Sequence, residues 1–249
     1  MTTIELNEFL VAKAEQFESL NFIEDDPISI PHRFKQKEDI EIIGLLVATI
    51  AWGNRKSIIK SGNKLVSIFG ESPYDYVMNY NSTRRIDFVH RTFSGADLEF
   101  FIQALRTIYE ADGLEVAFKK SASEGIEIAI SNFRNTMLKT PHLARSTKHL
   151  SNPMINSACK RINMFLRWMV RSNANGVDFG IWKTLSPKDL HIPLDVHTGN
   201  IARKLRIFER TQNDGKSSQL LYEFAKELIP DDPSKLDFAL FGLGAIEKF

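Results

Sequence analysis

Cysteine is nearly absent from this chain, which has only Cys159 among its 249 residues. A single thiol cannot close a disulfide within the chain, and cysteine-ligated zinc sites and iron–sulfur clusters need several thiolates. We therefore expect no internal disulfide and no iron–sulfur cluster. Nothing else in the sequence indicates a metal or another cofactor.

Long apolar runs are missing as well, because no stretch approaches the roughly 20 residues that span a bilayer. The first residues, "MTTIELNEFLVAKAEQF", form an acidic amphipathic segment. This segment has neither the basic start nor the apolar core of a signal peptide. These absences predict a cytoplasmic protein with no membrane partner, and a monomer is the default expectation.

Acidic residues are absent from one long stretch, residues 128–177, although the whole chain has a net charge of only +1. A local basic block of this kind is typical of proteins that bind phosphate-rich ligands such as nucleic acid. The alternative is a basic surface that acidic neighbours balance in space. The cations of the block are Arg134, Lys139, Arg145, Lys148, Lys160, Arg161, Arg167 and Arg171.

Helical periodicity is what the sequence does contain. Apolar residues recur at intervals of three and four, and the apolar stretches "ISI" and "LHIPL" are too short to build a sheet. The predicted fold class is all-α. The expected helices lie within residues 7–17, 37–52, 54–70, 72–80, 94–112, 113–123, 125–140, 157–172, 195–208 and 217–229.

Residues 157–171 are predicted to form a helix that buries an oily face and presents a cationic one. Ser157 is the candidate N-cap. Spacings of three and four place Ile162, Phe165, Leu166 and Met169 on the apolar face, and Lys160, Asn163, Arg167 and Arg171 on the cationic face.

Lys160 falls in the first turn of this expected helix. The positive end of the helix dipole and the neighbouring Arg161 both disfavour an ammonium group there. A neutral amine is the form that acts as a nucleophile. The alternative is an ordinary solvated lysine on a basic face.

The stretch "IPLDVHTGNIARKL", residues 192–205, resembles the aspartate-bearing segment of the helix-hairpin-helix DNA glycosylases, the superfamily of endonuclease III and 8-oxoguanine DNA glycosylase. Its pattern is an apolar residue, the catalytic Asp, a His two residues on, and a helix that ends in Arg-x-Leu-like residues. Asp195 and His197 occupy the two named positions. On pattern alone, Asp195 is also a good helix N-cap.

Two further segments resemble the same superfamily in the same order. "SACKRINMFLRWMV" is similar to the end of its hairpin and the following helix, with Lys160 at the position of the lysine in bifunctional members. "IEIIGLLVATIAWGNRK" is similar to an early core helix, with Asn54 at the position of the residue inserted into DNA. The whole chain is closer still to a family of uncharacterised bacterial proteins in this superfamily, through "KRINMFLRWMVR", "VDFGIW" and "LFGLGAI".

The hairpin and the segment after it depart from the superfamily pattern. Asn156 and Ala158 stand where hairpin glycines are usual, although Asn tolerates the left-handed backbone and Ala is small. The gap between Lys160 and Asp195 is long, so "VDFGIWKTLSPKDLH" resembles an insertion. Within it, Trp182 and Phe179 are expected to pin the loop, or else to form a base pocket.

The resemblance implies one two-lobed domain over residues 1–249, with a cleft between helical lobes. Residues 36–175 would form the central lobe with the hairpin, and residues 1–35 with 190–249 the second lobe. The implied function is excision of damaged bases, such as oxidised ones, from double-stranded DNA, with Schiff-base lyase activity at abasic sites.

The resemblance also implies roles for individual residues. Asp195 would stabilise positive charge on the sugar, and Lys160 would form the Schiff base. Asn54 would fill the gap that the flipped base leaves. The remaining nucleic-acid contacts would come from Arg55, Lys56, Asn156, Arg161, Arg167, Arg171 and His197.

Other interpretations remain open at this point. One is a non-catalytic helical protein that binds nucleic acid, and another is a pocket for a free nucleoside. A metal site from His191, Asp195 and His197 is disfavoured because no helical pair of histidines supports it. Trp52 or Trp168 could stack on a base, but a tryptophan at helical spacing is more often part of a core.

Overall fold

A computed structural model describes residues 2–81 and 85–249. The chain divides into two compact units. The central unit comprises Asp25–Asn152, and the terminal unit combines Met1–Glu24 with Pro153–Phe249. The two strands, β1 (Val89–His90) and β2 (Phe93–Ser94), are each two residues long, and helices dominate the rest of the described residues. The prediction of an all-α protein is confirmed.

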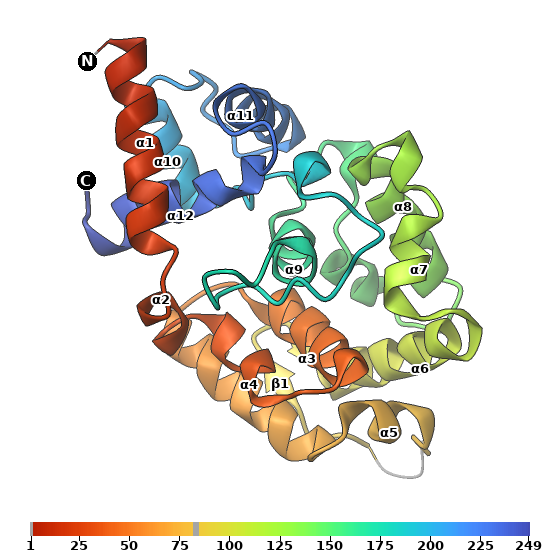
Figure 1. Cartoon of the computed structure of the whole chain (residues 1–249). Helices are drawn as coiled ribbons and strands as arrows, with labels where there is room; N and C mark the ends of the chain where they lie inside the picture. Colours follow the sequence, from red (N-terminus) through yellow and green to blue (C-terminus); the bar gives the residue numbers. More distant parts are fainter. Residues whose placement is uncertain (1, 82–84) are drawn as a thin grey trace. The chain divides into compact units, whose positions relative to one another are not determined.

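Helices also surround the short hairpin in the central unit (Figure 1). The α-helices of this unit are α3 (Lys37–Ile50), α4 (Arg55–Phe69), α5 (Pro73–Met78), α6 (Gly95–Ala111), α7 (Gly113–Lys119) and α8 (Ile126–Met137). The unit also contains short 3-10 turns. These are η1 (Pro27–Ser29) and η2 (Pro31–Arg33) before α3, η3 (Ala122–Glu124) between α7 and α8, and η4 (Ala144–His149) after α8.

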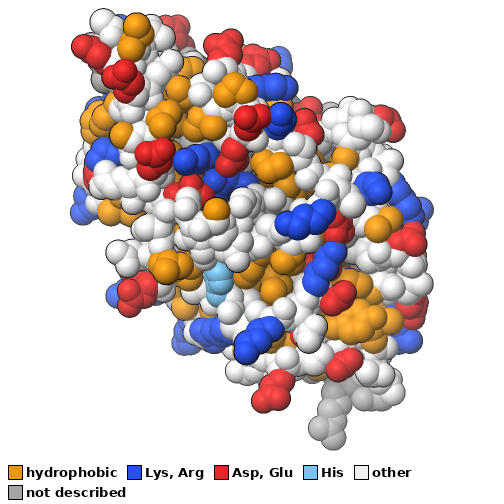
Figure 2. Space-filling model, viewed as in Figure 1, with side chains coloured by type: hydrophobic (Ala, Val, Ile, Leu, Met, Phe, Trp, Pro, Cys, Tyr) orange, Lys and Arg blue, Asp and Glu red, His pale blue; other side chains and the backbone are white. Residues whose placement is uncertain are grey.

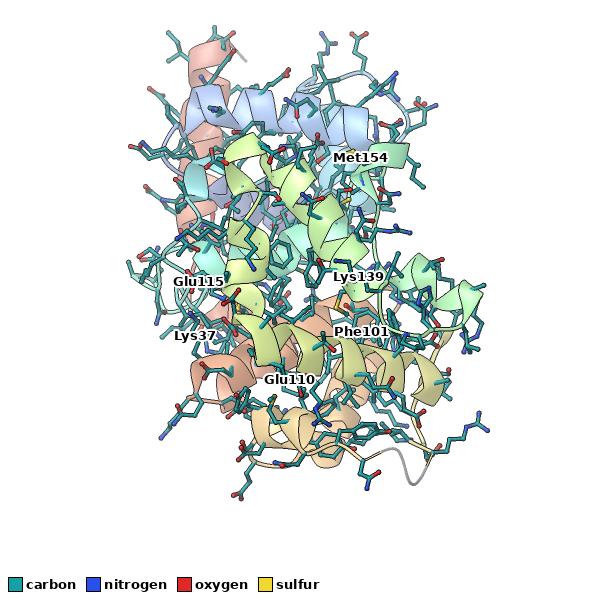
Figure 3. The ribbon with its side chains drawn as sticks, turned by 90° about the vertical axis from the view of Figure 1, so that its right-hand side faces the viewer. Lys37, Phe101, Glu110, Glu115, Lys139 and Met154 are labelled. Carbon is teal, nitrogen blue, oxygen red and sulfur yellow. The ribbon has the colours of Figure 1, made fainter. Side chains whose placement is uncertain are left out.

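Helix α3 is the core helix of the central unit, as its apolar sequence predicts. Every residue from Asp39 to Ile50 is buried. The buried carboxylate of Glu41 accepts a hydrogen bond from the Tyr109 hydroxyl of α6 at 2.7 Å. At the start of α3, Lys37 pairs with Glu115 of α7 (Figure 3). These polar contacts join α3 to α6 and α7. Lys37 also lies 4.0 Å from Glu41, so the buried carboxylate has both a hydrogen-bond donor and a cation beside it.

The terminal unit is built from both ends of the chain. Its α-helices are α1 (Thr3–Phe17), α2 (Asn21–Glu24), α9 (Lys160–Val170), α10 (Val196–Lys204), α11 (Gly215–Leu228) and α12 (Leu236–Phe241), and α12 continues into a π-helical turn, η8 (Gly242–Ile246). Three 3-10 turns complete it: η5 (Pro153–Ile155), η6 (Pro187–Asp189) and η7 (Pro233–Lys235).

Helix α1 packs directly against α12 in the terminal unit (Figure 1). Leu10 and Ala14 of α1 share a core with Ile201 of α10 and Leu240 of α12. Gly242 permits the close approach, because a Cβ there would lie 2.2 Å from the ring of Phe17. The first and last segments of the chain therefore form one hydrophobic core.

The boundaries between the units differ from those expected at residues 36 and 175. Residues 25–35 belong to the central unit because η1 and η2 pack on α3, and the buried Ile30 contacts α4 at Gly62. The turn before α9 and α9 itself belong to the terminal unit, where Arg167 and Arg171 pair with carboxylates, as described below. Sequence order alone does not reveal such pairs.

None of the helices that the structure describes combines the length and apolar character needed to cross a membrane.

Gly95, the first residue of α6, offers a test of the central unit. A Cβ at this position would lie 1.9 Å from the backbone oxygen of Ile86, which cannot move aside as a flexible side chain can. We expect Gly95→Ala to lower the free energy of unfolding by about 2–3 kcal/mol, measured by urea denaturation.

Gly62→Ala is the matched control, since its Cβ would meet only the side chain of Ile30, at 2.9 Å. Alanine also gains helix propensity, so the net change should stay below about 1 kcal/mol. Equal losses for the two variants would contradict the steric argument.

Candidate active site

The turn that precedes α9 places Lys160 at the first helical position. Cys159 is the N-cap, with φ 50°, and Asn156 has φ 64°, so two residues of the turn adopt the left-handed backbone without being glycine. Ser157 is not the N-cap, because its Oγ accepts from the N–H of Cys159, outside the helix. The expected helix start at Ser157 is therefore corrected to Lys160.

Lys160 and Asp195 form an ion pair in the terminal unit. Lys160 Nζ lies 3.8 Å from Asp195 Oδ2, and the two side chains are 30% and 20% exposed. These residues lie far apart in the sequence, and the fold brings their functional groups together. Both side chains are partly exposed, so a ligand can reach the pair. The buried part of each side chain restricts the positions of the two functional groups.

Asp195 is also the N-cap of α10, as its sequence pattern predicts. Its Oδ1 accepts a hydrogen bond from the backbone N–H of Thr198 at 2.9 Å, and Oδ2 faces Lys160. The hydrogen bond from the backbone fixes the orientation of the carboxylate at the start of the helix. One oxygen therefore fixes the side chain while the other remains available for chemistry.

Arg167 and Arg171 do not present a cationic face to solvent, which corrects their expected role in nucleic-acid binding. Their exposed fractions are 2% and 3%. Arg167 pairs with Asp178, at 3.3 Å, and with Asp237. Arg171 pairs with Glu18 at 2.6 Å, with Asp232 at 2.8 Å and with Asp178.

We call this set the arginine–carboxylate ladder: Arg167, Arg171, Glu18, Asp178, Asp232 and Asp237. Despite burial, which acts in the opposite direction, its carboxylates raise the pKa of Arg171. The carboxylates come from the C-cap of α1, from the loop after α9, and from the segment before and within α12. No spacing in the sequence pairs them with the arginines, which is why the ladder was not predicted.

Asp237 connects the ladder to the Lys160–Asp195 pair. Burial raises the pKa of Asp237 to about 6, and the negative charge of Asp195 adds to this increase. Arg167 and Lys160 act in the opposite direction. Because the charges of Lys160 and Asp195 both affect the pKa of Asp237, the pair is electrostatically coupled to the ladder.

Asn163 of the expected cationic face and the predicted contact residue Arg161 are only partly exposed or buried. Asn163 is buried, and its Nδ2 donates to the backbone oxygen of Ala158 at 3.1 Å. Arg161 is half-buried, and burial lowers the pKa of its guanidinium group. Lys160 and Arg161 are thus the cations of α9 that retain some exposure.

Asn156 joins the hairpin to α11. Its Nδ2 donates to Asp214 at 3.0 Å, while its Oδ1 accepts from the backbone N–H of Lys216 at 3.1 Å. Its backbone oxygen accepts from Gly215 at 2.9 Å. Asn156 adopts the left-handed backbone that Asn tolerates, with φ 64°, and its side chain makes a structural contact between two segments.

The other predicted contact residues lie in separate places. Asn54 is exposed and caps α4 in the central unit, where its Oδ1 accepts from Ser57 N–H at 3.3 Å. Arg55 and Lys56 follow it in the first turn of α4. His197 is exposed in the first turn of α10, with its ring edge-on to Phe241.

The tryptophans of the terminal unit are core residues. Trp168 is fully buried, and Trp182 packs edge-on against Phe165 of α9 with 5.4 Å between ring centroids. The backbone N–H of Phe179 donates to Trp168, and that of Trp182 donates to Met169. The expectation that Trp182 and Phe179 pin the inserted loop is confirmed.

The acid-free block is balanced by acidic neighbours in space. Besides the ladder, Arg145 pairs with the buried carboxylate of Asp97 at 3.0 Å. On the face drawn in Figure 2, lysine and arginine side chains are interspersed with aspartate and glutamate. The alternative interpretation of the basic block is therefore correct for much of its charge.

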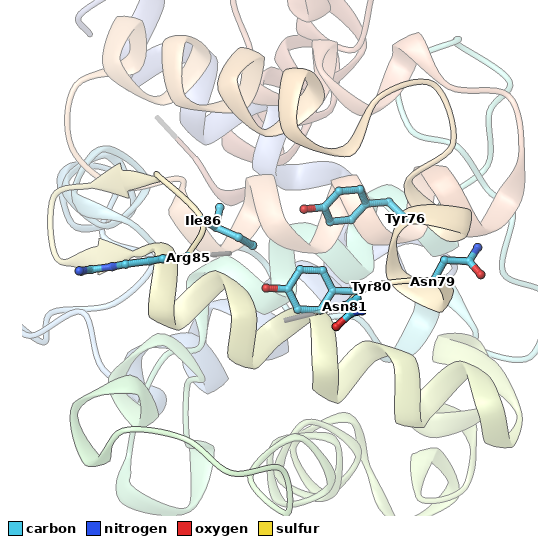
Figure 4. A pocket seen from close by; sticks show the side chains of 6 residues that line it. All are labelled: Tyr76, Asn79, Tyr80, Asn81, Arg85 and Ile86. Atoms are coloured by element: carbon cyan, nitrogen blue, oxygen red, sulfur yellow. The ribbon is translucent and has the colours of Figure 1, made fainter. Parts of the chain in front are cut away.

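A pocket of about 370 Å³ lies in the central unit, and none of the predicted site residues lines it (Figure 4). It is lined by Tyr76, Asn79, Tyr80, Asn81, Arg85 and Ile86.

Within residues 2–81 and 85–249, no three His, Cys, Asp or Glu side chains are placed to hold a metal ion. His191 stacks on Tyr222 with 4.4 Å between ring centroids.

Residues 26–246 match the model of a family described as "Protein of unknown function (DUF2400)". The chain belongs to this family. The match includes the central unit and most of the terminal unit, with Lys160, Asp195 and the arginines of the ladder. No curated protein and no solved structure gives a significant match. Because the family description names no reaction, we infer the function of this DUF2400 protein from the geometry of its candidate site.

The ladder predicts a strong effect of Arg171 on stability. Arg171→Met would leave Glu18, Asp178 and Asp232 facing one another without their shared cation. We expect a loss of about 3–5 kcal/mol in the free energy of unfolding, measured by urea denaturation at neutral pH.

Arg106→Met is the control, because Arg106 makes an exposed pair with Glu110 within α6. Its loss should cost less than about 1 kcal/mol. If the two variants were equally stable, the ladder would contribute no more than a surface ion pair.

His191 predicts a pH dependence of stability. Burial lowers its pKa to about 4, from the ordinary value of 6.5. The unfolded chain therefore takes up a proton at higher pH than the folded chain, and stability is lost as the pH falls from 6.5 towards 4. The loss due to this group should reach about 3 kcal/mol.

His191→Phe keeps an aromatic ring beside Tyr222 but cannot titrate, so this part of the pH dependence should disappear in urea unfolding at pH 4 to 7. His32→Phe, in η2, should leave it unchanged. A wild-type dependence that persists in His191→Phe would show that other groups cause it.

Proposed function

We propose that this protein is a DNA base-excision glycosylase of the helix-hairpin-helix type, with Schiff-base lyase activity at abasic sites. The observation that carries the proposal is the 3.8 Å approach of Lys160 Nζ to Asp195 Oδ2. An amine and a carboxylate at this distance can act on the same sugar carbon of a flipped nucleotide.

The two groups suit the two halves of the reaction. As the bond between the sugar and the base breaks, positive charge develops on the sugar, and the carboxylate of Asp195 stabilises it. The neutral amine of Lys160 then bonds to the sugar carbon that the base has left. Loss of a proton from this nitrogen and cleavage of the ring carbon–oxygen bond, with a proton taken up by the ring oxygen, give the covalent Schiff base. The Schiff base then permits cleavage of the DNA strand.

The surroundings of the pair support these roles. The N-cap hydrogen bond from Thr198 holds the carboxylate of Asp195 in place beside Lys160. Lys160 lies at the first helical position of α9, next to Arg161.

The DNA contacts are proposed for the exposed and half-exposed residues. Asn54 would fill the space of the flipped base, with Arg55 and Lys56 on the flanking phosphates. Arg161 and His197 lie within two residues of Lys160 and Asp195 in sequence, and would contact the nucleotide or its phosphates. The left-handed turn before α9 would serve as the hairpin of the helix-hairpin-helix fold.

A non-catalytic nucleic-acid-binding protein is the second candidate. The observation in its favour is that Asp195 is the N-cap of α10 and pairs with Lys160, so both residues have contacts that a purely structural role would explain. Such a protein would bind DNA in a salt-dependent manner without turnover. Asp195→Asn would then leave DNA binding and every other activity unchanged.

Lys160→Gln separates the two candidates. Wild-type protein incubated with borohydride and a duplex containing an abasic site should give a covalent protein–DNA adduct. Lys160→Gln should lower the yield at least ~100-fold, because glutamine carries no nucleophilic amine to form the Schiff base. Lys188→Gln, at an exposed lysine of η6, should trap as the wild type does. An adduct that persists in Lys160→Gln would remove this residue from the role.

Asp195→Asn tests the carboxylate without removing the helix cap, because asparagine caps as well as aspartate. The variant should fold with unchanged helicity by circular dichroism. Excision on duplexes with oxidised or otherwise damaged bases should slow by roughly 100-fold or more. Unfolding of the variant would instead indicate that Asp195 is mainly a structural residue.

A further inference from the structure

Arg91 occupies the turn of the β1–β2 hairpin in an unusual backbone conformation. The register of the two strands, with His90 opposite Phe93, leaves Arg91 and Thr92 as the connecting residues. Arg91 has φ 53°, a region that glycine, asparagine and aspartate adopt most readily. The hairpin therefore carries a residue that its backbone geometry does not favour, and such positions often have a function.

The Arg91 side chain lies on the loop that leads to Asn54. Its guanidinium carbon is 4.6 Å from the centroid of the Trp52 ring, a cation–π contact. Gly53 makes room for it, because a Cβ on Gly53 would lie 2.6 Å from Arg91 Nη1. His90 Nε2 adds a contact of 3.3 Å to the backbone oxygen of Trp52. The hairpin and the loop before α4 thus form one packed surface.

Arg91 brings an uncompensated positive charge to this surface. Arg91 is exposed, and no Asp or Glu that the structure describes lies within ion-pair distance of it. The same holds for the exposed Lys56 in the first turn of α4. Arg145, by contrast, pairs with Asp97 and also donates to Thr92 and Ser94. Arg91 and Lys56 are therefore available for an external anion.

We propose that the tip of the β1–β2 hairpin is a DNA-backbone contact in which Arg91 binds a phosphate beside Asn54. The stacked guanidinium keeps its N–H edge free, and that planar edge matches a phosphate in a two-point hydrogen bond. Trp52 fixes the plane of the group in advance, so little side-chain entropy is lost on binding. The hairpin and the first turn of α4 then hold the backbone on which Asn54 acts.

His90 adds no charge to this contact. Burial lowers the pKa of His90 and the charge of Arg91 lowers it further, although the contact with Trp52 acts in the opposite direction. Ser61 Oγ lies 2.8 Å from the other ring nitrogen, so both nitrogens face protein atoms. The exposed apolar side chain of Val89, 65% accessible, lies one residue before His90.

This inference depends on DNA binding within the proposed function, and Arg91→Gly tests it sharply. Glycine favours the positive φ of the turn, so the variant should fold with a melting temperature within a few degrees of the wild type. It removes the phosphate contact, however. Its affinity for a fluorescent duplex with an abasic site should be about 10-fold weaker than that of the wild type. The affinity is measured by fluorescence anisotropy at about 50 to 200 mM salt.

The salt dependence distinguishes a phosphate contact from a structural effect. The slope of log binding constant against log salt should fall by about 1 in Arg91→Gly. Arg91→Lys retains the charge without the planar edge, so it should restore the slope but only part of the affinity. Arg106→Gln, an exposed arginine of the same unit that pairs with Glu110, should change neither quantity.

The outcomes separate this inference from the proposed enzyme. If Arg91→Gly and Arg106→Gln bound DNA alike, the contact at Arg91 would be disproved even when borohydride trapping succeeds. If trapping failed but the slope still depended on Arg91, the catalytic proposal would fail and the contact would stand. If the wild type bound no duplex, both would be overturned.

Discussion

Two buried guanidinium groups determine how the terminal unit is assembled. Arg167 and Arg171 cannot leave water without partners, because an isolated buried charge costs far more than a folded domain can offset. Their carboxylates come from Glu18, Asp178, Asp232 and Asp237, in segments that are distant in the sequence. Satisfying the arginines therefore requires α1, the loop after α9 and α12 to converge on one helix.

This convergence also positions the candidate catalytic pair. Lys160 and Arg167 are seven residues apart in α9 and so lie on the same face of the helix. Arg167 is held by Asp237 of α12, and α12 packs against α10, which Asp195 caps. The ladder thus orients the helix that carries Lys160 and supports the helix that follows Asp195. Stability and the geometry of the site depend on the same ion pairs.

The N-cap and the proposed catalytic roles of Asp195 do not compete. A cap uses one carboxylate oxygen, and the other remains directed at Lys160. In the central unit, Asn54 combines a cap with an exposed position in the same way, and Arg91 lies on the loop that presents it. Both units therefore use helix N-termini to fix polar side chains at the surface, where backbone hydrogen bonds limit their motion.

The sequence by itself determined the helical class, the buried character of α3 and the N-cap at Asp195, because these depend on local periodicity and on hydrogen bonds between near neighbours. Only the tertiary structure decided that Arg167 and Arg171 face inward, that α9 belongs with the chain ends, and that Lys160 meets Asp195. Periodicity reveals that a helix has a charged face, but not whether distant carboxylates or solvent will cover it, since that depends on contacts between remote segments.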